Sequence, residues 1–435
     1  MRRPILIALA MLAPACTFDL RPGDGDRQVG TTAAEPEPIT AVAGRLFYPE
    51  RVALPSGAVL ELQVERFHAD GRRTLANFRR SLDGDQVPLP VALSFERSAE
   101  AGALDELRGR IRHEGALIRD TGPVLLDPGS DRIDLGRVQL HPVDSGDLGV
   151  SWQCGERVLR FVSQGAGASL LAGDRRIELE QVPAASGVRY EAPGDAAVWV
   201  HEKGGDFLFS LDGEALRDCR PLADAVLPLE ARGNEPGWLL RLGSNSAALD
   251  YDYGEASMTL PLIDTESRGR HLHFRAAGGR QALVAVLTAE ICNDDATGMP
   301  HPWRVGVQVP GRRFDGCGGR PRDLLTGAEW VVERLGEAAL DRLGHEITLQ
   351  FDPDGRLGGR SACNRFTAGY RLSGEGLSIE RPAATKMACP DAVMALERRF
   401  FDLLAGTRRF EIGAGGELVL VAGDERLVAR RAAPD

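Results

Sequence analysis

The 435-residue chain lacks the short motifs that identify many enzymes. It contains no G-x-S-x-G elbow, no H-E-x-x-H helix, no P-loop and no Rossmann glycine pattern. Its seven cysteines include no C-x₂-C pair and its eight histidines are scattered, so the sequence gives no support for a zinc site. We therefore expect a protein that binds rather than catalyses, without a cofactor or a metal.

The chain also lacks an excess of positive charge. Its formal net charge is −11, and an acidic surface of this kind repels nucleic acid and anionic lipid while attracting basic proteins. We therefore expect no nucleic-acid partner. The plainer explanation, that acidity only keeps the protein soluble, is favoured when the charge is considered by itself.

A hydrophobic run long enough to cross a bilayer is missing from the N-terminal region. A basic head, MRR, precedes PILIALAMLAP at residues 4–14, which has the length of a signal-peptide core. The small residues before Cys16 predict cleavage after Ala15, and therefore a signal peptide over residues 1–15.

The stretch LAPAC around this site resembles a bacterial lipobox, although Ala13 stands where a Leu is usual. The resemblance implies that Cys16 carries acyl chains and anchors the chain to a membrane. Because Thr17 rather than Asp follows, it implies an outer-membrane lipoprotein facing the periplasm. A plain secretory site, and hence a soluble periplasmic protein, is the alternative.

Seven cysteines in an exported chain leave one without a disulfide partner, and acylation of Cys16 accounts for it. The other six allow fifteen pairings. They fall into three clusters along the chain, so pairing of neighbours is the simplest hypothesis. It predicts the disulfides Cys154–Cys219, Cys292–Cys317 and Cys363–Cys389.

The body of the chain is expected to be mostly β, with four small sandwich-like or barrel-like modules in tandem. Residues 16–40 are rich in Gly, Pro, Asp, Glu and Thr and are predicted to form a tether. In the first module, residues 41–141, Leu60, Leu62 and Val64 alternate with polar residues, as in a half-buried strand. Its stretches FYPERVALPSGAVLELQVE and VPLPVALSF resemble the YbaY family of envelope lipoprotein domains, which implies a β-sandwich without known chemistry.

The second module, residues 148–222, contains WQC near its start, SGVRY, a Trp followed by Lys-Gly, and a closing Cys. This set resembles the membrane-bound inhibitors of c-type lysozyme. The resemblance implies that c-type lysozyme is the partner of the module. From Val150 to Cys219 the module has eleven acidic and seven basic residues, a net charge of −4 that suits a basic enzyme.

Two further modules complete the chain. Residues 232–320 resemble an uncharacterised envelope domain, and their CNDD stretch is predicted to be a polar loop beside a disulfide rather than a calcium site. Residues 323–433 carry CNRF and TKMAC and resemble the META/HslJ domain, an α+β fold with an envelope-stress role. In this module the spacing of apolar residues predicts one C-terminal helix, with Asp391 as its N-cap and Gly406 at C′. Asn364 and Arg365 are either a binding site or loop caps.

The resemblance of the second module assigns the candidate site. Ser186 matches the serine of the SG-x-x-Y motif, and Gly187 suits a protruding tight turn. Lys203 matches the lysine of a Trp-x-Lys-Gly motif, although two additional residues separate it from Trp199. Arg189 is expected at the rim. The alternative for Ser186, Gly187 and Lys203 is that Ser-Gly and Lys-Gly-Gly form ordinary hairpin turns.

Three functional hypotheses follow. The first is a membrane-anchored inhibitor that inserts Ser186 and Lys203 into the cleft of c-type lysozyme. The second is an envelope-stress or assembly lipoprotein that binds another envelope component or a small toxic compound. The third, an enzyme, has no supporting motif.

Overall fold

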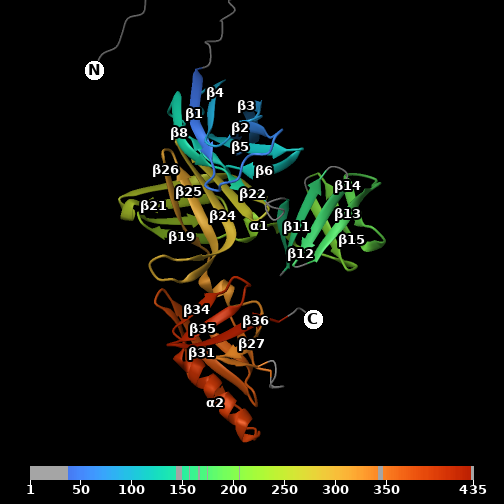
Figure 1. Cartoon of the computed structure of the whole chain (residues 1–435), viewed down its shortest axis with the longest axis vertical. Helices are drawn as coiled ribbons and strands as arrows, with labels where there is room; N and C mark the ends of the chain where they lie inside the picture. Colours follow the sequence, from blue (N-terminus) through green and yellow to red (C-terminus); the bar gives the residue numbers. More distant parts are fainter. Residues whose placement is uncertain are drawn as a thin grey trace, which may run out of the picture. The chain divides into compact units, whose positions relative to one another are not determined.

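The computed structural model describes residues 38–143, 149–155, 157–164, 167–173, 175–204, 206–340 and 346–432. The predicted signal peptide, the predicted lipidation site Cys16 and the predicted tether up to residue 37 lie outside the described residues. Within them β-strands dominate, as the sequence predicts, and they follow one another along the chain in four sets (Figure 1). None of the described helices has the length and apolar character that crossing a membrane requires.

The first set forms two sheets. One has the order β4-β1-β8 and consists of β1 (Ile39–Phe47), β4 (Leu89–Glu96) and β8 (Arg132–Gln139), with β8 parallel to β1. The other has the order β3-β2-β5-β6-β9, with β7 paired to β5, and consists of β2 (Val59–His68), β3 (Gly71–Ser81), β5 (Leu104–His113), β6 (Ala116–Asp120), β7 (Val124–Leu126) and β9 (His141–Pro142). The predicted alternation in β2 is confirmed, because Leu60, Leu62 and Val64 are buried. The hydrophobic core of the first module contains residues of both sheets, as expected for a sandwich.

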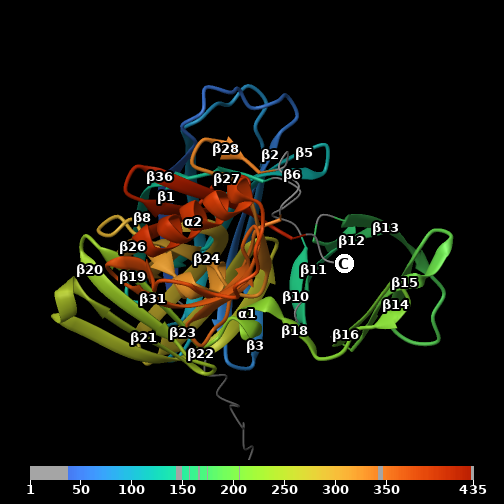
Figure 2. The ribbon, with the colours of Figure 1, turned by 90° about the horizontal axis from the view of Figure 1, so that it is seen from below.

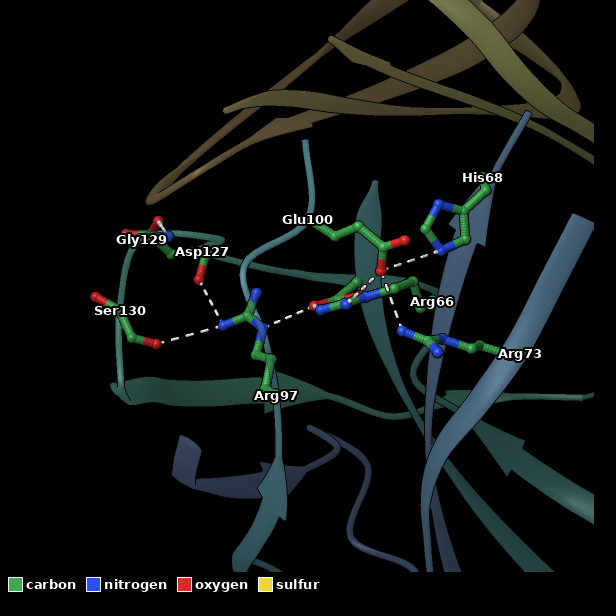
Figure 3. Close-up of polar contacts among 9 residues, drawn as sticks. Arg66, His68, Arg73, Arg97, Glu100, Asp127, Gly129 and Ser130 are labelled. Carbon is green, nitrogen blue, oxygen red and sulfur yellow. Dashed lines mark hydrogen bonds and ion pairs between the residues drawn. The ribbon is translucent and has the colours of Figure 1, made fainter. Parts of the chain in front are cut away.

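A buried ionic cluster joins strands of this module (Figure 3). The Asp105 carboxylate accepts two hydrogen bonds from Arg66, at 2.6 and 2.8 Å, and one from Arg97 at 2.7 Å. Glu100 lies against Arg66 at 2.9 Å and Arg73 at 3.0 Å. Arg66 is 2% exposed and Asp105 4%, so each charge depends on its partners for compensation.

The second set is one antiparallel sheet, ordered β17-β16-β15-β14-β13-β12-β11-β10-β18. Its strands are β10 (Val150–Cys154), β11 (Arg157–Gln164), β12 (Gly167–Ala172), β13 (Arg175–Val182), β14 (Val188–Ala192), β15 (Asp195–Lys203), β16 (Asp206–Leu211), β17 (Glu214–Ala215) and β18 (Cys219–Pro221). The sheet curves round its own core, which includes Trp152, Leu170 and Val200 (Figure 2). Cys154 and Cys219 face each other on β10 and β18 and form a disulfide.

The third set is a closed antiparallel barrel, running in chain order from β19 to β26. Its strands are β19 (Leu229–Asn234), β20 (Gly237–Leu242), β21 (Ser246–Tyr251), β22 (Ala256–Arg268), β23 (His271–Gly278), β24 (Gln281–Asn293), β25 (Pro300–Val309) and β26 (Arg312–Gly318). The short helix α1 (Leu222–Ala225) precedes it, and the 3-10 turns η2 (Asp252–Gly254) and η3 (Pro321–Leu324) interrupt and follow it. Along β23, Leu272, Phe274 and Ala276 point into the barrel core, so the alternate residues of this strand point outward.

The fourth set is a larger antiparallel sheet with the helix α2 (Asp391–Gly406). Its strands are β27 (Glu329–Leu335), β28 (Ala338–Ala339), β29 (Thr348–Phe351), β30 (Arg356–Arg360), β31 (Arg365–Ser373), β32 (Gly376–Ile379), β33 (Ala383–Ala384), β34 (Arg409–Ile412), β35 (Leu418–Ala422) and β36 (Glu425–Arg431). The predicted helix is present, but its predicted caps are wrong. Pro390 is the N-cap, without a side-chain cap, so Asp391 is the first helical residue, and Gly406 is the last helical residue rather than C′.

The disulfides Cys154–Cys219, Cys292–Cys317 and Cys363–Cys389 are the pairs that the clustering of cysteines predicts. Each closes a loop within one set of strands. Such closures restrict the unfolded chain, which matters most for the second set because it is small.

Candidate functional site

The candidate site is formed by two loops at the same end of the second sheet. Ser186 and Gly187 end the loop between β13 and β14, and Lys203 ends β15 at its hairpin with β16. In the register of β14 and β15, Val188 lies opposite Glu202. The next pair along these strands is therefore Gly187 and Lys203. The sheet thus brings together two stretches that are sixteen residues apart in sequence. We call Ser186, Gly187 and Lys203 the two-loop site.

Gly187 is required by the close approach of these loops. Its φ is +72°, a backbone conformation that favours glycine. A Cβ placed there would lie 2.0 Å from the carbonyl oxygen of Glu202 and 3.1 Å from the Cα of Lys203. Only a residue without a side chain fits between the loops, so Gly187 sets the position of Ser186 beside the lysine hairpin.

His201 supports the same loop, and the sequence reasoning missed it. Its Nε2 lies 2.8 Å from the carbonyl oxygen of Ser186, so the ring and the carbonyl share a hydrogen bond. His201 pairs with Arg189 across the two strands. The strand alternation from Trp199 to Lys203 is the signal that could have drawn attention to this side chain.

The two polar groups of the site are available to a partner. Ser186 and Lys203 are both exposed. Within the described part of the chain, the Ser186 hydroxyl has no hydrogen-bond partner and the Lys203 ammonium has no ion-pair partner. Lys203 is also chemically distinctive, because only two of the 52 Lys and Arg residues of the chain are lysines, Lys203 and Lys386.

Arg189 is less free than the other predicted site residues. Its Nε donates a hydrogen bond of 2.7 Å to Glu191, and its guanidinium lies over the ring of Trp199, 4.4 Å from the ring centroid. Tyr190 is buried against Phe161, as expected for a residue that packs beneath the loops. Contact of Arg189 with a partner stays a prediction.

The two additional residues between Trp199 and Lys203 lie within a strand. β15 runs without interruption from Asp195 to Lys203, and Lys203 pairs with Asp206 at the hairpin end. The longer spacing therefore lengthens the strand and places the lysine at its tip. A hydroxyl donor and an ammonium at neighbouring tips suit a surface that carries two carboxyl groups.

The other polar candidates of the sequence have structural roles. The Asn364 side chain is buried, accepts hydrogen bonds from Thr385 and from the backbone of Met387, and donates one of 2.9 Å to Glu397. It caps a loop, whereas Arg365 is exposed.

In the CNDD stretch, one Asp294 oxygen accepts hydrogen bonds from Ala296 and Thr297, and the other accepts one from Asn234. This carboxylate therefore organises its own loop. Across the described residues, no group of three or more His, Cys, Asp and Glu side chains is arranged to hold a metal ion.

Comparison with protein families matches three separate parts of the chain. Residues 37–135 match the type III secretion system lipoprotein chaperone family (YscW), rather than the YbaY family that the sequence resembles. Residues 152–217 match the membrane-bound lysozyme-inhibitor of c-type lysozyme family, and residues 323–434 match the META domain. The search of curated proteins found no match.

Two solved structures are similar to a quarter of the chain. One is an alternative pilotin from the type II secretion system of Vibrio cholerae, with 25% identity over 25% of this chain and 99% of that chain. The other is a protein from Burkholderia xenovorans, with 25% identity over 26% of this chain and 86% of that chain. The TM-score is 0.23 for both, which is too low to support an argument. The family matches show a multidomain chain with lipoprotein-type, lysozyme-inhibitor and META parts, consistent with a place in the bacterial envelope.

Proposed function

We propose that this protein inhibits c-type lysozyme by placing Ser186 and Lys203 in the active-site cleft of the enzyme. The observation that carries the proposal is the two-loop site, in which two exposed polar groups without partners among the described residues occupy adjacent loop ends. The match of residues 152–217 to the lysozyme-inhibitor family supports it. The protein acts by binding and performs no catalysis of its own.

The chemistry of the cleft explains the choice of groups. Lysozyme uses two carboxyl groups, one kept protonated as the acid and one ionised. An inhibitor that excludes water from the cleft must satisfy both, because a buried charge without a partner weakens the complex. The Ser186 hydroxyl can donate a hydrogen bond to one carboxyl group, and the Lys203 ammonium can pair with the other.

Long-range charge assists the encounter. The second module has a net charge of −4 over residues 150–219, and c-type lysozymes are basic. Opposite fields accelerate association, and salt screens them over a Debye length of about 8 Å at physiological ionic strength. The association rate should therefore fall as salt is added.

Inhibition by the purified protein (residues 17–435) tests the proposal. The wild type should inhibit c-type lysozyme with one-to-one stoichiometry. Ser186→Ala and Lys203→Ala should each weaken binding by about 1–3 kcal/mol, the loss of one buried polar partner, or roughly 5- to 150-fold in Kd. The matched controls are Ser378→Ala and Lys386→Ala, which alter exposed residues of the fourth module. Full inhibition by both site variants would remove the two-loop site from the mechanism.

We propose further that the chain is held at the periplasmic face of the outer membrane through acylated Cys16. The family matches to lipoprotein and membrane-bound proteins support this location. A fatty-acid analogue should label the wild type and leave Cys16→Ser unlabelled. Labelling of both would place the acyl chain elsewhere.

A second candidate function rests on the first module. Its match to a lipoprotein chaperone family favours a role in binding another envelope protein. If the purified protein leaves c-type lysozyme fully active at stoichiometric excess, this assembly role becomes the better explanation and the inhibitor-like module has another use.

A further inference from the structure

A cavity of about 390 Å³ lies between the first module and the outer face of the barrel. The first module contributes residues of β5, β6 and β9, including Arg108 and Asp120. The barrel contributes residues of β22 to β26, including Arg268 and His273. None of the three family matches covers both walls of this cavity, because the barrel lies outside all of them.

Buried contacts hold the walls of this cavity together. Arg275 of the barrel is 1% exposed and donates a hydrogen bond of 2.8 Å to Glu106 of the first module, which is 3% exposed. The same guanidinium lies over the ring of Phe67, 4.0 Å from the centroid. Gln308 of the barrel bonds the backbone of the first module twice, accepting from Leu125 at 3.1 Å and donating to Pro123 at 2.8 Å. The cavity is therefore a built feature of the fold.

The lining of the cavity is basic, although the chain as a whole is acidic. Five arginines and three histidines line it, against the two acidic residues Asp120 and Glu290. Glu290 pairs with Arg304, and Arg313 pairs at 3.0 Å with Asp315, which lies outside the lining. Asp120 lies at 3.7 Å from Arg108 and 3.5 Å from Arg110. One carboxylate is thus shared between two arginines, and positive charge remains in excess.

Three side chains in the wall have a nitrogen without a hydrogen bond. Arg268 is half-buried and forms no ion pair or hydrogen bond with any residue that the structure describes. The Nε of Arg108 makes no hydrogen bond, and neither does the Nδ1 of His273, although both side chains are more than nine-tenths buried. Arg268 thus offers a guanidinium without a partner among the described residues, whereas the unbonded atoms of Arg108 and His273 are covered by protein atoms.

The pKa shifts of Arg268 and His273 agree with a positive electrostatic potential in the cavity. Burial, and then the nearby Arg108, lower the pKa of the Arg268 guanidinium. Burial, and then Arg108 and Arg275, hold the pKa of His273 well below its ordinary value, so the ring is neutral at pH 7.

We infer that this cavity binds a small organic oxyanion, a phosphate or carboxylate group carried on a compact apolar body. The guanidinium groups of Arg108 and Arg268 match the fork geometry of an oxyanion. The apolar body would face Leu117, Val143 and Val286, which also line the cavity. The volume lies at the lower end of the range of about 300–1,000 Å³ for small-molecule sites. This activity is independent of lysozyme binding.

Ligand-induced thermal stabilisation of the purified protein tests the inference. The probes are phenyl phosphate, inorganic phosphate, benzoate and phenol. Phenyl phosphate or benzoate should raise the melting temperature saturably and at lower concentration than inorganic phosphate, while phenol should have no effect. The comparison of phenyl phosphate with benzoate identifies which oxyanion the site prefers. No response to any of the three anions would overturn the inference.

Arg268→Gln should weaken the response roughly 10- to 100-fold in apparent Kd, the loss expected for a charge-assisted hydrogen bond, without lowering the melting temperature of the unliganded protein. The matched control is Arg280→Gln, at an exposed turn of the same barrel, which should respond like the wild type. If Arg268→Gln and the wild type respond equally, the anion binds elsewhere on the surface and not in this cavity. Should the variant fold poorly, crystals of the wild type soaked in 4-bromophenyl phosphate decide the matter, because the bromine must lie inside this cavity.

Discussion

Gly187→Ala offers a sharp test of how the two-loop site is built. Two costs add at this position. Alanine at φ +72° costs about 1 kcal/mol relative to glycine. Its Cβ would also lie 2.0 Å from the Glu202 carbonyl oxygen, and relieving such overpacking costs typically about 1–3 kcal/mol. We expect a total of about 2–4 kcal/mol, with β14 and β15 forced apart where they carry Ser186 and Lys203.

Gly194→Ala is the matched control for this prediction. Gly194 lies in the turn that joins the same two strands, has φ +76°, and has nothing within 4 Å of the position of a Cβ. It therefore carries the backbone cost without the clash. Hydrogen exchange of the β14 and β15 amides reports the local free energy of opening, and lysozyme inhibition reports the function. Equal exchange and equal inhibition in the two variants would refute the reasoning.

Two further predictions concern stability. Asp105→Asn removes the charge that compensates buried Arg66 and Arg97, so the free energy of unfolding of the first module, measured in urea, should fall by about 3–5 kcal/mol. The control Asp70→Asn, at an exposed turn, should change it by less than about 0.5 kcal/mol. For Glu397, burial raises the pKa, but hydrogen bonds from Ser361, Asn364 and Cys363 outweigh it and leave the pKa below its usual range. Its contribution to stability is therefore present above the unfolded-state pKa of about 4.3 and is lost as the pH falls through the folded-state value. Glu397→Gln should lower the free energy of unfolding of the fourth module at pH 7 by about 1.5–3 kcal/mol, measured by urea unfolding. It should also flatten the pH dependence of this free energy below about 4.5. A pH profile equal to that of the wild type would contradict the role given to the Glu397 carboxylate.

The sequence predicts the features that depend on local pattern. Alternation in β2, the order of the strand sets, the three disulfides and the position of α2 all follow from spacing along the chain. The helix caps do not, because Pro390 with ψ 148° occupies the N-cap and shifts Asp391 into the first turn. A proline there is compatible with helix initiation, and the preference of Asp for capping is overridden.

Glu397 is a buried polar residue that the spacing of apolar residues does not reveal. It lies at helical spacing between Val393 and Phe400, on the buried stripe of α2, yet it is a carboxylate. Its partners come from the loop around Asn364, more than thirty residues earlier. A charged residue on an otherwise apolar face therefore indicates a buried polar contact, but not which loop supplies it.

The cavity between the first module and the barrel could not be predicted from the sequence. Its arginines are spread from Arg108 to Arg313 over four strands and one turn, so no local pattern in the sequence brings them together. Only the packing of the first module on the outer face of β23 converts these exposed positions into the wall of a cavity. The same holds for the two-loop site, since the register of β14 and β15 decides that Gly187 meets Lys203.

Lysine labelling tests the central claim most directly, because the chain has only Lys203 and Lys386. Both are exposed, so an amine-reactive reagent should modify both in the free protein. Mass spectrometry of this chain in complex with c-type lysozyme should show Lys203 protected and Lys386 modified at its free rate. If Lys203 reacts as fast in the presence of saturating lysozyme as in its absence, its ammonium does not enter the cleft and the proposed mechanism is wrong.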